Sequence, residues 1–341
     1  MYQSKLVNEY KENEKYGNGY RINYLKGIQR VVEQRKQECF QKRATYTEQI
    51  LQNQEECRKE YLDMLGWPLN AEKSPILSVS ENKIFENDSY AFYRMQFELF
   101  EGYLFYGILF RHKTDEALPL VVAQHGGRGT PELCSSFFDC ENYNDMSMRI
   151  FHKGVNVFAP QMLLWEKDRF GPDRQRNEMD NAFKQLGGSI AALEIYSISR
   201  CLDYFEEQTY CNGKFGMAGL SYGGFYTLYT AAADTRIQSA LASSHFNDRT
   251  VYNWTDKVWF DSASRFLDAQ VALLICPRFL RIEVGDNDEL FDAAFAKKEF
   301  ETVKRHYQPC ENVQFHIFKG VHEFCPEDDG IDEMLSRLEV T

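Results

Sequence analysis

The spacing of apolar residues changes along the chain and predicts two kinds of backbone. Up to about Pro68 the sequence is dense in Lys, Glu and Gln and poor in Gly and Pro, which predicts helix. Thr45 and Glu48 have the spacing of a capping box, which marks a helix start, and Gly66 before Pro68 marks a stop. The residues that recur at helical spacing, and that we expect to pack on the main domain, are Ile50, Leu51, Cys57, Tyr61, Leu62 and Leu65.

A period of two begins at about Ser89. Met95, Phe97 and Leu99 alternate with polar residues. Glu101-Gly102 then marks a turn, and a second aromatic-rich run follows from Tyr103 to Phe110. Alternation on both sides of a short turn predicts an antiparallel hairpin.

Short apolar runs separated by helical stretches follow the hairpin. One connecting helix is clear, because Ala191, Ile195, Ile198, Leu202 and Phe205 share a face. Strands that alternate with helices predict a mostly parallel sheet covered on both faces, in one large α/β domain. The expected strands are Leu118 to Ala123, Val155 to Ala159, Lys214 to Ala218, Ser239 to Ala242, Phe279 to Val284 and Val313 to Phe318.

Composition and charge exclude several classes of protein. The 341 residues hold 39 Lys+Arg against 51 Asp+Glu, a formal charge of −12, which argues against a nucleic-acid binder. A hydrophobic share of 43% is ample for a large core and excludes disorder. The first twenty residues carry no secretory apolar segment, and no run approaches the roughly 18 apolar residues of a membrane span. Nine cysteines without a C-x-x-C pair match neither a disulfide framework nor a zinc site, so we expect reduced thiols and a cytoplasmic protein.

The sharpest chemical signal is Gly219-Leu220-Ser221-Tyr222-Gly223-Gly224, a G-x-S-x-G motif. It follows the predicted strand Lys214 to Ala218 and precedes the helical run Phe225 to Ala233. A nucleophile elbow requires this context, because small residues let the chain reverse sharply and present the serine hydroxyl above the sheet. Ser221 is therefore the candidate nucleophile; the alternative is a glycine-rich turn with an incidental serine.

A serine nucleophile needs a base and an acid, which follow it in the order Asp or Glu, then His. Three such groups converge when each lies at the carboxyl end of a parallel strand. The predicted strand Val313 to Phe318 is followed by His322, the candidate base. Asp286 and Asp288 both follow the strand before it. We favour Asp288, since the loop needs about two residues to turn back, and expect Asp286 to accept backbone hydrogen bonds in the turn.

The loop after the predicted strand Leu118 to Ala123 begins Gln124-His125-Gly126-Gly127. In this arrangement one oxyanion-hole N–H comes from that loop and the other from the residue after the nucleophile. We assign the two donors to Gly127 and Tyr222. His125 is a second base candidate, although its place before the glycines favours a structural role that shapes the loop.

Other kinds of chemistry lack their signatures. The sequence has neither a G-x-x-x-x-G-K-[ST] phosphate loop nor a G-x-G-x-x-G after the first strand, so we expect no nucleotide cofactor. His322-Glu323 has no second histidine at helical spacing, and we expect no metal. We interpret the charged segment from Glu166 to Arg176 as a solvated loop. The alternative is that it forms part of the rim of the active site.

With these motifs in place, the chain resembles the α/β-hydrolases over about residues 85 to 341, and within them the dienelactone-hydrolase and acetyl-xylan-esterase-like branch. The resemblance implies an α/β-hydrolase catalytic domain at residues 76–341, preceded by a helical extension at 1–75. It also supports Asp288 as the acid, three residues after Gly285, and His322 as the base. The matching stretches are His125-Gly126-Gly127, the elbow Gly219 to Gly224, Ala231 to Ile237, Cys276-Pro277-Arg278, Gly285-Asp286-Asn287-Asp288 and Gly320-Val321-His322-Glu323-Phe324.

The resemblance implies a cofactor-free serine esterase that acts on small, often acetyl, esters of carbohydrates. Secreted xylan-acting relatives carry signal peptides, and the lack of one here favours a small imported ester as substrate. The elbow also resembles that of prolyl-oligopeptidase-like peptidases, although their β-propeller has no counterpart in the first 85 residues. A noncatalytic binding scaffold is the third alternative. We expect neither nucleic acid nor membrane as a partner, and consider a homo-oligomer formed through the N-terminal helices.

Overall fold

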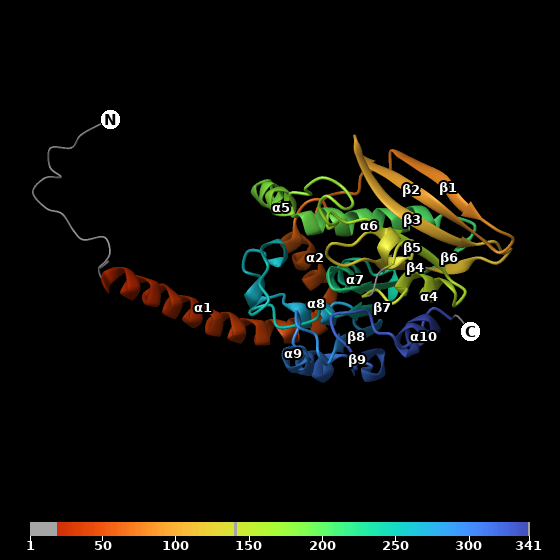
Figure 1. The fold of residues 1–341 in the computed structure, drawn as a ribbon. Helices are drawn as coiled ribbons and strands as arrows, with labels where there is room; N and C mark the ends of the chain where they lie inside the picture. The colour runs from red at the N-terminus through yellow and green to blue at the C-terminus, as the bar shows by residue number, and fades with distance from the viewer. Residues whose placement is uncertain (1–18, 140–141, 340–341) are drawn as a thin grey trace, which may run out of the picture.

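A nine-stranded sheet forms the centre of the computed structural model, which describes residues 19–139 and 142–339 (Figure 1). Its strand order is β1-β2-β3-β5-β4-β6-β7-β8-β9. The strands are β1 (Ser78–Glu86), β2 (Tyr90–Phe100), β3 (Tyr103–His112), β4 (Leu118–Gln124), β5 (Asn156–Pro160), β6 (Cys211–Leu220), β7 (Ile237–Ser243), β8 (Phe279–Gly285) and β9 (Val313–Phe318). The helices are α1 (Gly19–Gln52), α2 (Gln54–Leu65), α3 (Pro131–Cys134), α4 (Met146–Phe151), α5 (Arg176–Gln185), α6 (Ile190–Glu206), α7 (Tyr222–Ala233), α8 (Asp268–Leu273), α9 (Ala293–His306) and α10 (Asp329–Ser336).

Strand pairing divides the sheet into an antiparallel edge and a parallel body. β1 to β3 form an antiparallel meander that joins β5, also antiparallel. From β5 through β4, β6, β7 and β8 to β9, every pairing is parallel. The predicted hairpin and mostly parallel sheet are therefore confirmed.

β1 was not predicted from the sequence. It lies at the sheet edge, pairs with β2 alone among the strands, and exposes most of its residues, including Glu81 and Lys83. Charged residues protect an open edge from pairing with other chains, and they also remove the apolar alternation by which a strand is recognised.

Helices cover both faces of the sheet, as the continuous apolar strands require. Along β4, Leu120 and Val122 pack in the core beneath α2, α6, α7, α8 and α9. Val121 and Ala123 point to the opposite core, which α3, α4 and α10 close. Both faces of the central strands are thus buried, and their carboxyl ends are left to build a site.

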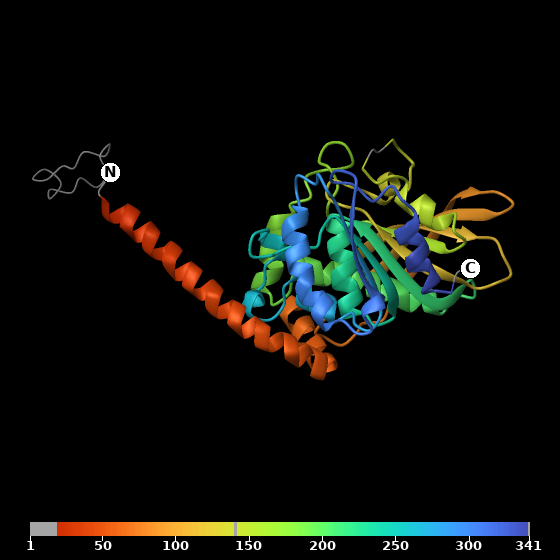
Figure 2. The same cartoon turned by 90° about the horizontal axis from the view of Figure 1, so that it is seen from below.

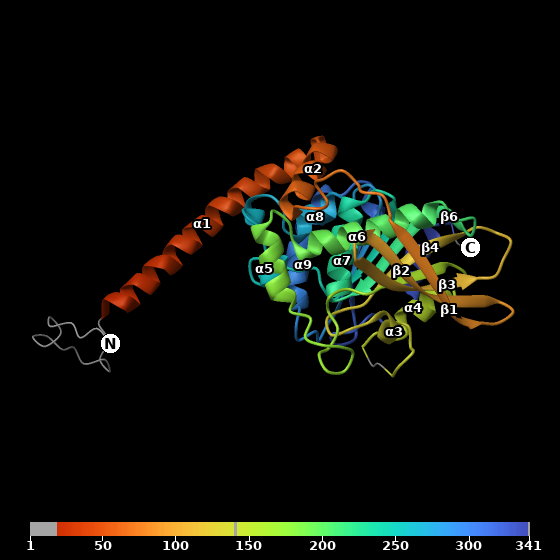
Figure 3. The ribbon, with the colours of Figure 1, turned by 90° about the horizontal axis from the view of Figure 1, so that it is seen from above.

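The N-terminal helices depart from prediction in where they begin and agree with it in how they pack. Thr45 and Glu48 lie inside α1, so no helix begins there. The predicted apolar stripe does pack on the body from the end of α1 and from α2, through buried residues such as Ile50 and Tyr61, although Leu51 is 41% exposed. The rest of α1 projects away from the sheet in all three views, as Figures 2 and 3 show most clearly. Among the described helices, none is both long and apolar enough to cross a membrane.

Candidate active site

Ser221 lies at the turn between the last residue of β6 and the first of α7. Its backbone has φ 58° and ψ −115°, a left-handed conformation that is costly for a residue with a side chain. The Ser221 N–H donates to Ser243 O of β7 at 2.9 Å, and the residue is 8% exposed. The strained strand-turn-helix geometry is that of a nucleophile elbow.

Two glycines allow this turn to form. A Cβ on Gly223 would lie 2.0 Å from Gln124 O, and one on Gly219 would lie 2.5 Å from the Gly223 backbone. Side chains at either position would force β4, β6 and α7 apart. The motif therefore requires glycine at these positions, where backbones approach closely. Main-chain packing holds Ser221 at the carboxyl end of β6.

His322 and Asp288 are brought together from two strand ends. His322 Nδ1 lies 2.9 Å from Asp288 Oδ2, and the Asp288 side chain is fully buried. The other carboxylate oxygen accepts the N–H groups of Leu290 and Phe291 at 2.8 and 2.9 Å. Burial opposes ionisation of Asp288, but these bonds and the His322 ring outweigh it and hold the pKa of the carboxyl below its ordinary value.

Asp286, the alternative acid, points elsewhere. Its side chain accepts the Gly320 N–H at 3.1 Å and pairs with Lys319 at 3.0 Å. Lys319 first and the Gly320 N–H second lower the pKa of the Asp286 carboxyl. Asp286 thus fastens the turn after β8 to the turn after β9, which is the backbone-accepting role expected for it.

The loop that carries His322 is fastened on both sides. Glu323 accepts the Asn144 side-chain N–H at 2.9 Å, and Ser244, the residue after β7, donates to Glu323 O at 3.2 Å. The Phe291 ring stacks on His322 with centroids 5.7 Å apart. Within the described residues no hydrogen bond joins Ser221 to His322, as is common before a substrate tightens such a site.

The two candidate oxyanion donors lie beside Ser221. A Cβ built on Gly126 would lie 3.2 Å from the Ser221 Cβ, and one on Gly127 would lie 3.3 Å from the Tyr222 ring. The Gly126 N–H donates to the Tyr143 hydroxyl at 2.8 Å. In the described part of the chain, neither the Gly127 nor the Tyr222 N–H donates to a protein group. These two N–H groups are thus available to a ligand oxygen.

His125 shapes this loop from a fully buried position. The Met162 N–H donates to its Nε2 at 3.0 Å, which assigns the ring proton to Nδ1, 2.8 Å from Gly126 O. Burial lowers the pKa of His125 to about 4, so the ring is neutral at pH 7. With both nitrogens engaged, His125 has the geometry of the structural role favoured for it.

A cavity of about 680 Å³ opens beside the two candidate oxyanion donors. Its wall includes Trp254, whose ring stacks on Tyr222 at 5.8 Å and contacts Phe291 at 5.5 Å. The remaining wall is largely polar or charged. The lining residues are Gly127, Arg128, Leu164, Asp173, Arg174, Gln175, Arg176, Asn177, Glu178, Tyr222, Asn253, Trp254, Thr255 and Asp256.

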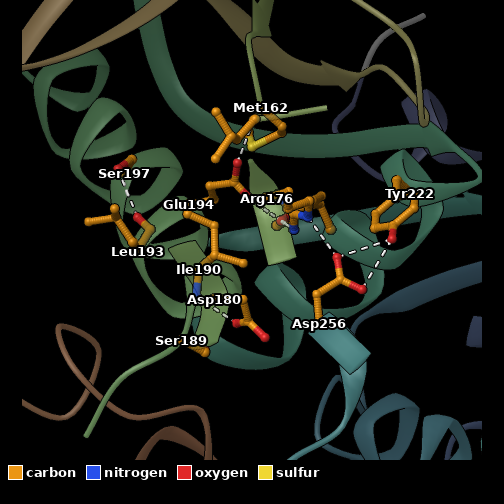
Figure 4. Close-up of polar contacts among 12 residues, drawn as sticks. Met162, Arg176, Asp180, Ser189, Ile190, Leu193, Glu194, Ser197, Tyr222 and Asp256 are labelled. Atoms are coloured by element: carbon orange, nitrogen blue, oxygen red, sulfur yellow. Dashed lines mark hydrogen bonds and ion pairs between the residues drawn. The ribbon is translucent and has the colours of Figure 1, made fainter. Parts of the chain in front are cut away.

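The charged segment from Glu166 to Arg176 is not simply a solvated loop. Arg174 lines the cavity, and Arg176 is buried, with its Nε 2.6 Å from Asp256 and its Nη1 2.9 Å from Glu194 (Figure 4). The sequence does not show which residues form this ion-pair cluster, because its members are 18 and 80 residues apart. The one local signal in the sequence is that Arg176 ends a run of charged residues.

Two groups of side chains with donor atoms close enough to hold a metal ion lie elsewhere in the described residues. One group combines His316, Cys325 and Glu327, and another combines Glu283, Cys325 and Asp329. Arg281 already pairs with Glu283 and Asp329 in the second group. Neither group includes Ser221, Asp288 or His322.

Comparison with known proteins agrees with this architecture. A candidate acetyl xylan esterase from Bacteroides fragilis superposes with a TM-score of 0.62 at 13% identity, over 83% of this chain and 81% of the other. A glucuronoyl esterase from Solibacter usitatus gives 0.58 at 11% identity, over 82% and 91%. The chain has the α/β-hydrolase fold. Acetyl xylan esterase 1 from Thermoanaerobacterium sp. gives 0.53 at 13% identity, over 84% and 92%.

Sequence comparison reaches less far than the comparison of folds. The family model for X-Pro dipeptidyl-peptidases of the S15 family matches residues 187–274, which include the elbow. No protein of curated function matches the sequence significantly. The predicted resemblance to acetyl-xylan-esterase-like α/β-hydrolases is confirmed at the level of fold, and its dienelactone-hydrolase part stays a prediction.

Proposed function

We propose that the protein is a serine hydrolase that cleaves carboxylic esters through an acyl-enzyme. The observation that carries this proposal is the His322–Asp288 hydrogen bond of 2.9 Å at the same end of the sheet as the strained Ser221 elbow. A serine hydroxyl becomes a useful nucleophile only with a base that an acid orients and stabilises. The two unengaged N–H groups of Gly127 and Tyr222 supply the fourth requirement, an oxyanion hole.

The mechanism follows from these groups. Ser221 Oγ attacks the ester carbonyl carbon while His322 Nε2 takes the hydroxyl proton, and Asp288 stabilises the imidazolium. The oxyanion accepts hydrogen bonds from the Tyr222 and Gly127 N–H groups. The ester C–O bond then breaks, and His322 returns the proton to the leaving alcohol. Water, deprotonated by His322, attacks the acyl carbon and breaks the bond to Ser221, which regains its proton.

We propose small acyl esters of carbohydrate-type alcohols, acetyl esters first, as the substrate class. The neighbours named as acetyl xylan and glucuronoyl esterases support this choice. So does the cavity beside the oxyanion donors, which sets the partly exposed Trp254 ring among polar side chains. An aromatic face within polar groups suits a hydroxylated ring better than a long alkyl chain.

The first test is covalent trapping of the nucleophile. Intact mass after treatment with a fluorophosphonate should show one adduct on the parent and none on Ser221→Ala, with p-nitrophenyl acetate turnover lost in parallel. Ser243→Ala is a matched control, since Ser243 is a buried serine at the neighbouring strand end. A folded parent without an adduct would contradict the proposal and favour a noncatalytic binding scaffold.

Peptide hydrolysis is the second candidate function. The observation that favours it is the match of residues 187–274 to the X-Pro dipeptidyl-peptidase model. The same nucleophile, base and oxyanion donors serve amide and ester cleavage. Comparing kcat/KM for an X-Pro p-nitroanilide with that for p-nitrophenyl acetate and acetylated sugars decides between them: a preference for the anilide would replace the esterase assignment.

We further propose that residues 76–341 form the hydrolase unit and that residues 1–75 are an extension through which two copies associate. On α1, Tyr24, Ile28 and Val31 recur on one face and are 73%, 44% and 57% exposed. The helix carries seven Lys or Arg against three Glu, on a chain of net charge −12. A basic, apolar arm is complementary to the acidic body of a second copy.

Sedimentation velocity tests this association. Ile28→Asp should shift a dimer to monomer, whereas Asn23→Asp, on another face of the same helix, should leave the dimer intact. A monomeric parent would contradict the proposal.

A cytoplasmic location is also proposed, supported by the free, mostly buried thiols of the eight described cysteines, which suit a reducing compartment.

A further inference from the structure

The side chain of Tyr222, whose N–H is a candidate oxyanion donor, is held on several sides. Its hydroxyl bonds both carboxylate oxygens of Asp256, at 3.1 and 3.0 Å. The Lys257 ammonium lies 3.7 Å from the ring centroid, and the Trp254 ring stacks at 5.8 Å. Motion of the Tyr222 backbone would therefore have to break contacts that the rest of the fold maintains.

Asp256 is itself fixed by a buried network. It is 2% exposed, and Arg176 donates to it from Nε at 2.6 Å while donating from Nη1 to Glu194 at 2.9 Å. Figure 4 shows Arg176 between Glu194 on one side and Asp256 on the other, with Tyr222 beyond Asp256. Arg176 also donates to the Tyr226 hydroxyl at 2.7 Å, one turn along α7 from Tyr222. The network thus grips the first turn of α7 at two points.

The same network reaches the second oxyanion donor. Glu194 Oε1 accepts the Leu163 N–H at 2.6 Å, next to Met162, whose N–H bonds His125. His125 in turn donates to Gly126 O at 2.8 Å. A connected path of short contacts therefore joins the Tyr222 side of the candidate hole to the loop that carries Gly127.

We propose that Asp256, backed by Arg176 and Glu194, is a positioning residue that sets the Tyr222 N–H relative to the Gly126-Gly127 loop and so fixes the geometry of the oxyanion hole. The proposal rests on the proposed function for its catalytic consequence, but the ordering of the Tyr222 amide is a property of the chain itself. Oxyanion donors act only when preorganised at about 2.7–3.1 Å from the developing charge, so a supporting network controls their effect.

Two variants break the link at different places. Tyr222→Phe removes only the hydroxyl, and Asp256→Asn removes the carboxylate charge that Arg176 and Tyr222 share. The matched control is Asp234→Asn, because Asp234 is a buried carboxylate paired with an arginine, Arg236, at the opposite end of α7. Each variant is compared by kcat and KM for p-nitrophenyl acetate and by its affinity for a trifluoromethyl ketone, which forms an oxyanion on the enzyme.

We expect kcat to fall about tenfold or more in both variants, below the roughly 10²–10³-fold loss of a deleted donor. KM should change little, ketone affinity should fall with kcat/KM, and the double variant should be no worse than the poorer single, because the two residues act as one unit. Unchanged kcat and ketone affinity in folded Tyr222→Phe would overturn the proposal. An equal loss in Asp234→Asn would overturn it too, by making the effect one of general stability.

A measurement independent of turnover separates this proposal from the esterase assignment. In protein labelled with ¹⁵N-tyrosine, the Tyr222 amide should give one sharp resonance in the parent and in Asp234→Asn. Asp256→Asn should broaden or shift it. If the parent takes no fluorophosphonate adduct, the esterase assignment fails while the amide result still decides positioning. If the adduct forms and the Tyr222 resonance is unmoved in Asp256→Asn, positioning alone fails.

Discussion

His322 Nδ1 and Asp288 Oδ2 are 2.9 Å apart, although 34 residues separate them in the chain. The contact exists because β8 and β9 are adjacent parallel strands whose carboxyl ends meet at one edge. The other oxygen of Asp288 accepts hydrogen bonds from two backbone N–H groups. The carboxylate is therefore held in one orientation, with Oδ2 toward the His322 ring. Among the described residues no hydrogen bond engages His322 Nε2, which is the nitrogen that the proposed mechanism requires to be available.

This contact makes Asp288→Asn an informative variant. An amide can donate to Nδ1 and stabilise the wrong tautomer, so kcat for p-nitrophenyl acetate should fall by about 10⁴, as in triads whose acid is amidated. Asp286→Asn is the matched control two residues away and should stay within severalfold of the parent. A larger loss in Asp286→Asn than in Asp288→Asn would reverse the assignment of the acid.

The buried His125 predicts a pH-dependent contribution to stability. Its pKa is about 4 in the folded chain against 6.5 when exposed, so the unfolded state binds more protons between these values. The contribution is complete above pH 6.5 and is lost as pH falls toward 4, by roughly 3 kcal/mol in total. Unfolding by urea at several pH values, for the parent and His125→Gln, measures it.

The quantity to compare is the difference, at each pH, between the free energies of unfolding of the parent and of His125→Gln. Burial raises the pKa of Glu283 and of Glu299 to about 7. These carboxyls bind protons more readily in the folded state, so they add stability as pH falls from 7 toward 4.5, opposite to His125. Taking the difference removes them. Parallel curves for the parent and His125→Gln would show that His125 is not the titrating group.

Sequence reasoning reached the parts of this molecule that local pattern determines. β9 was predicted residue for residue, since Val313 to Phe318 is a mostly apolar segment bounded by turn residues. The strained elbow at Ser221 follows from Gly219 and Gly223, which main-chain crowding requires. Asp256 was missed, because nothing local distinguishes a buried aspartate from a solvated one when its arginine lies 80 residues earlier. Long-range pairing of charges is decided by the fold.

Glycine at position 223 should be essential for folding. A methyl group there would lie 2.0 Å from Gln124 O, which is backbone and cannot rotate away. Gly223→Ala should therefore lower the free energy of unfolding by several kcal/mol, as strain at a packed backbone crossing does. Gly27→Ala, in α1 with nothing within 4 Å of the added carbon, should instead stabilise its helix by up to about 1 kcal/mol. Similar melting temperatures for both variants would contradict the crowding argument.

Removing Arg176 should destabilise the fold more than removing any surface arginine. Arg176 is 5% exposed and neutralises two buried carboxylates, so Arg176→Met leaves both uncompensated at a cost of about 3–5 kcal/mol. Arg35→Met is the matched control, since Arg35 pairs with Glu38 on the exposed part of α1, where such a pair contributes about 0–1 kcal/mol. Urea unfolding should separate the two variants by at least 2 kcal/mol, roughly the gap between these ranges. Equal stabilities would mean that Asp256 and Glu194 take up protons or water when the guanidinium is gone, and that the network tolerates neutralisation.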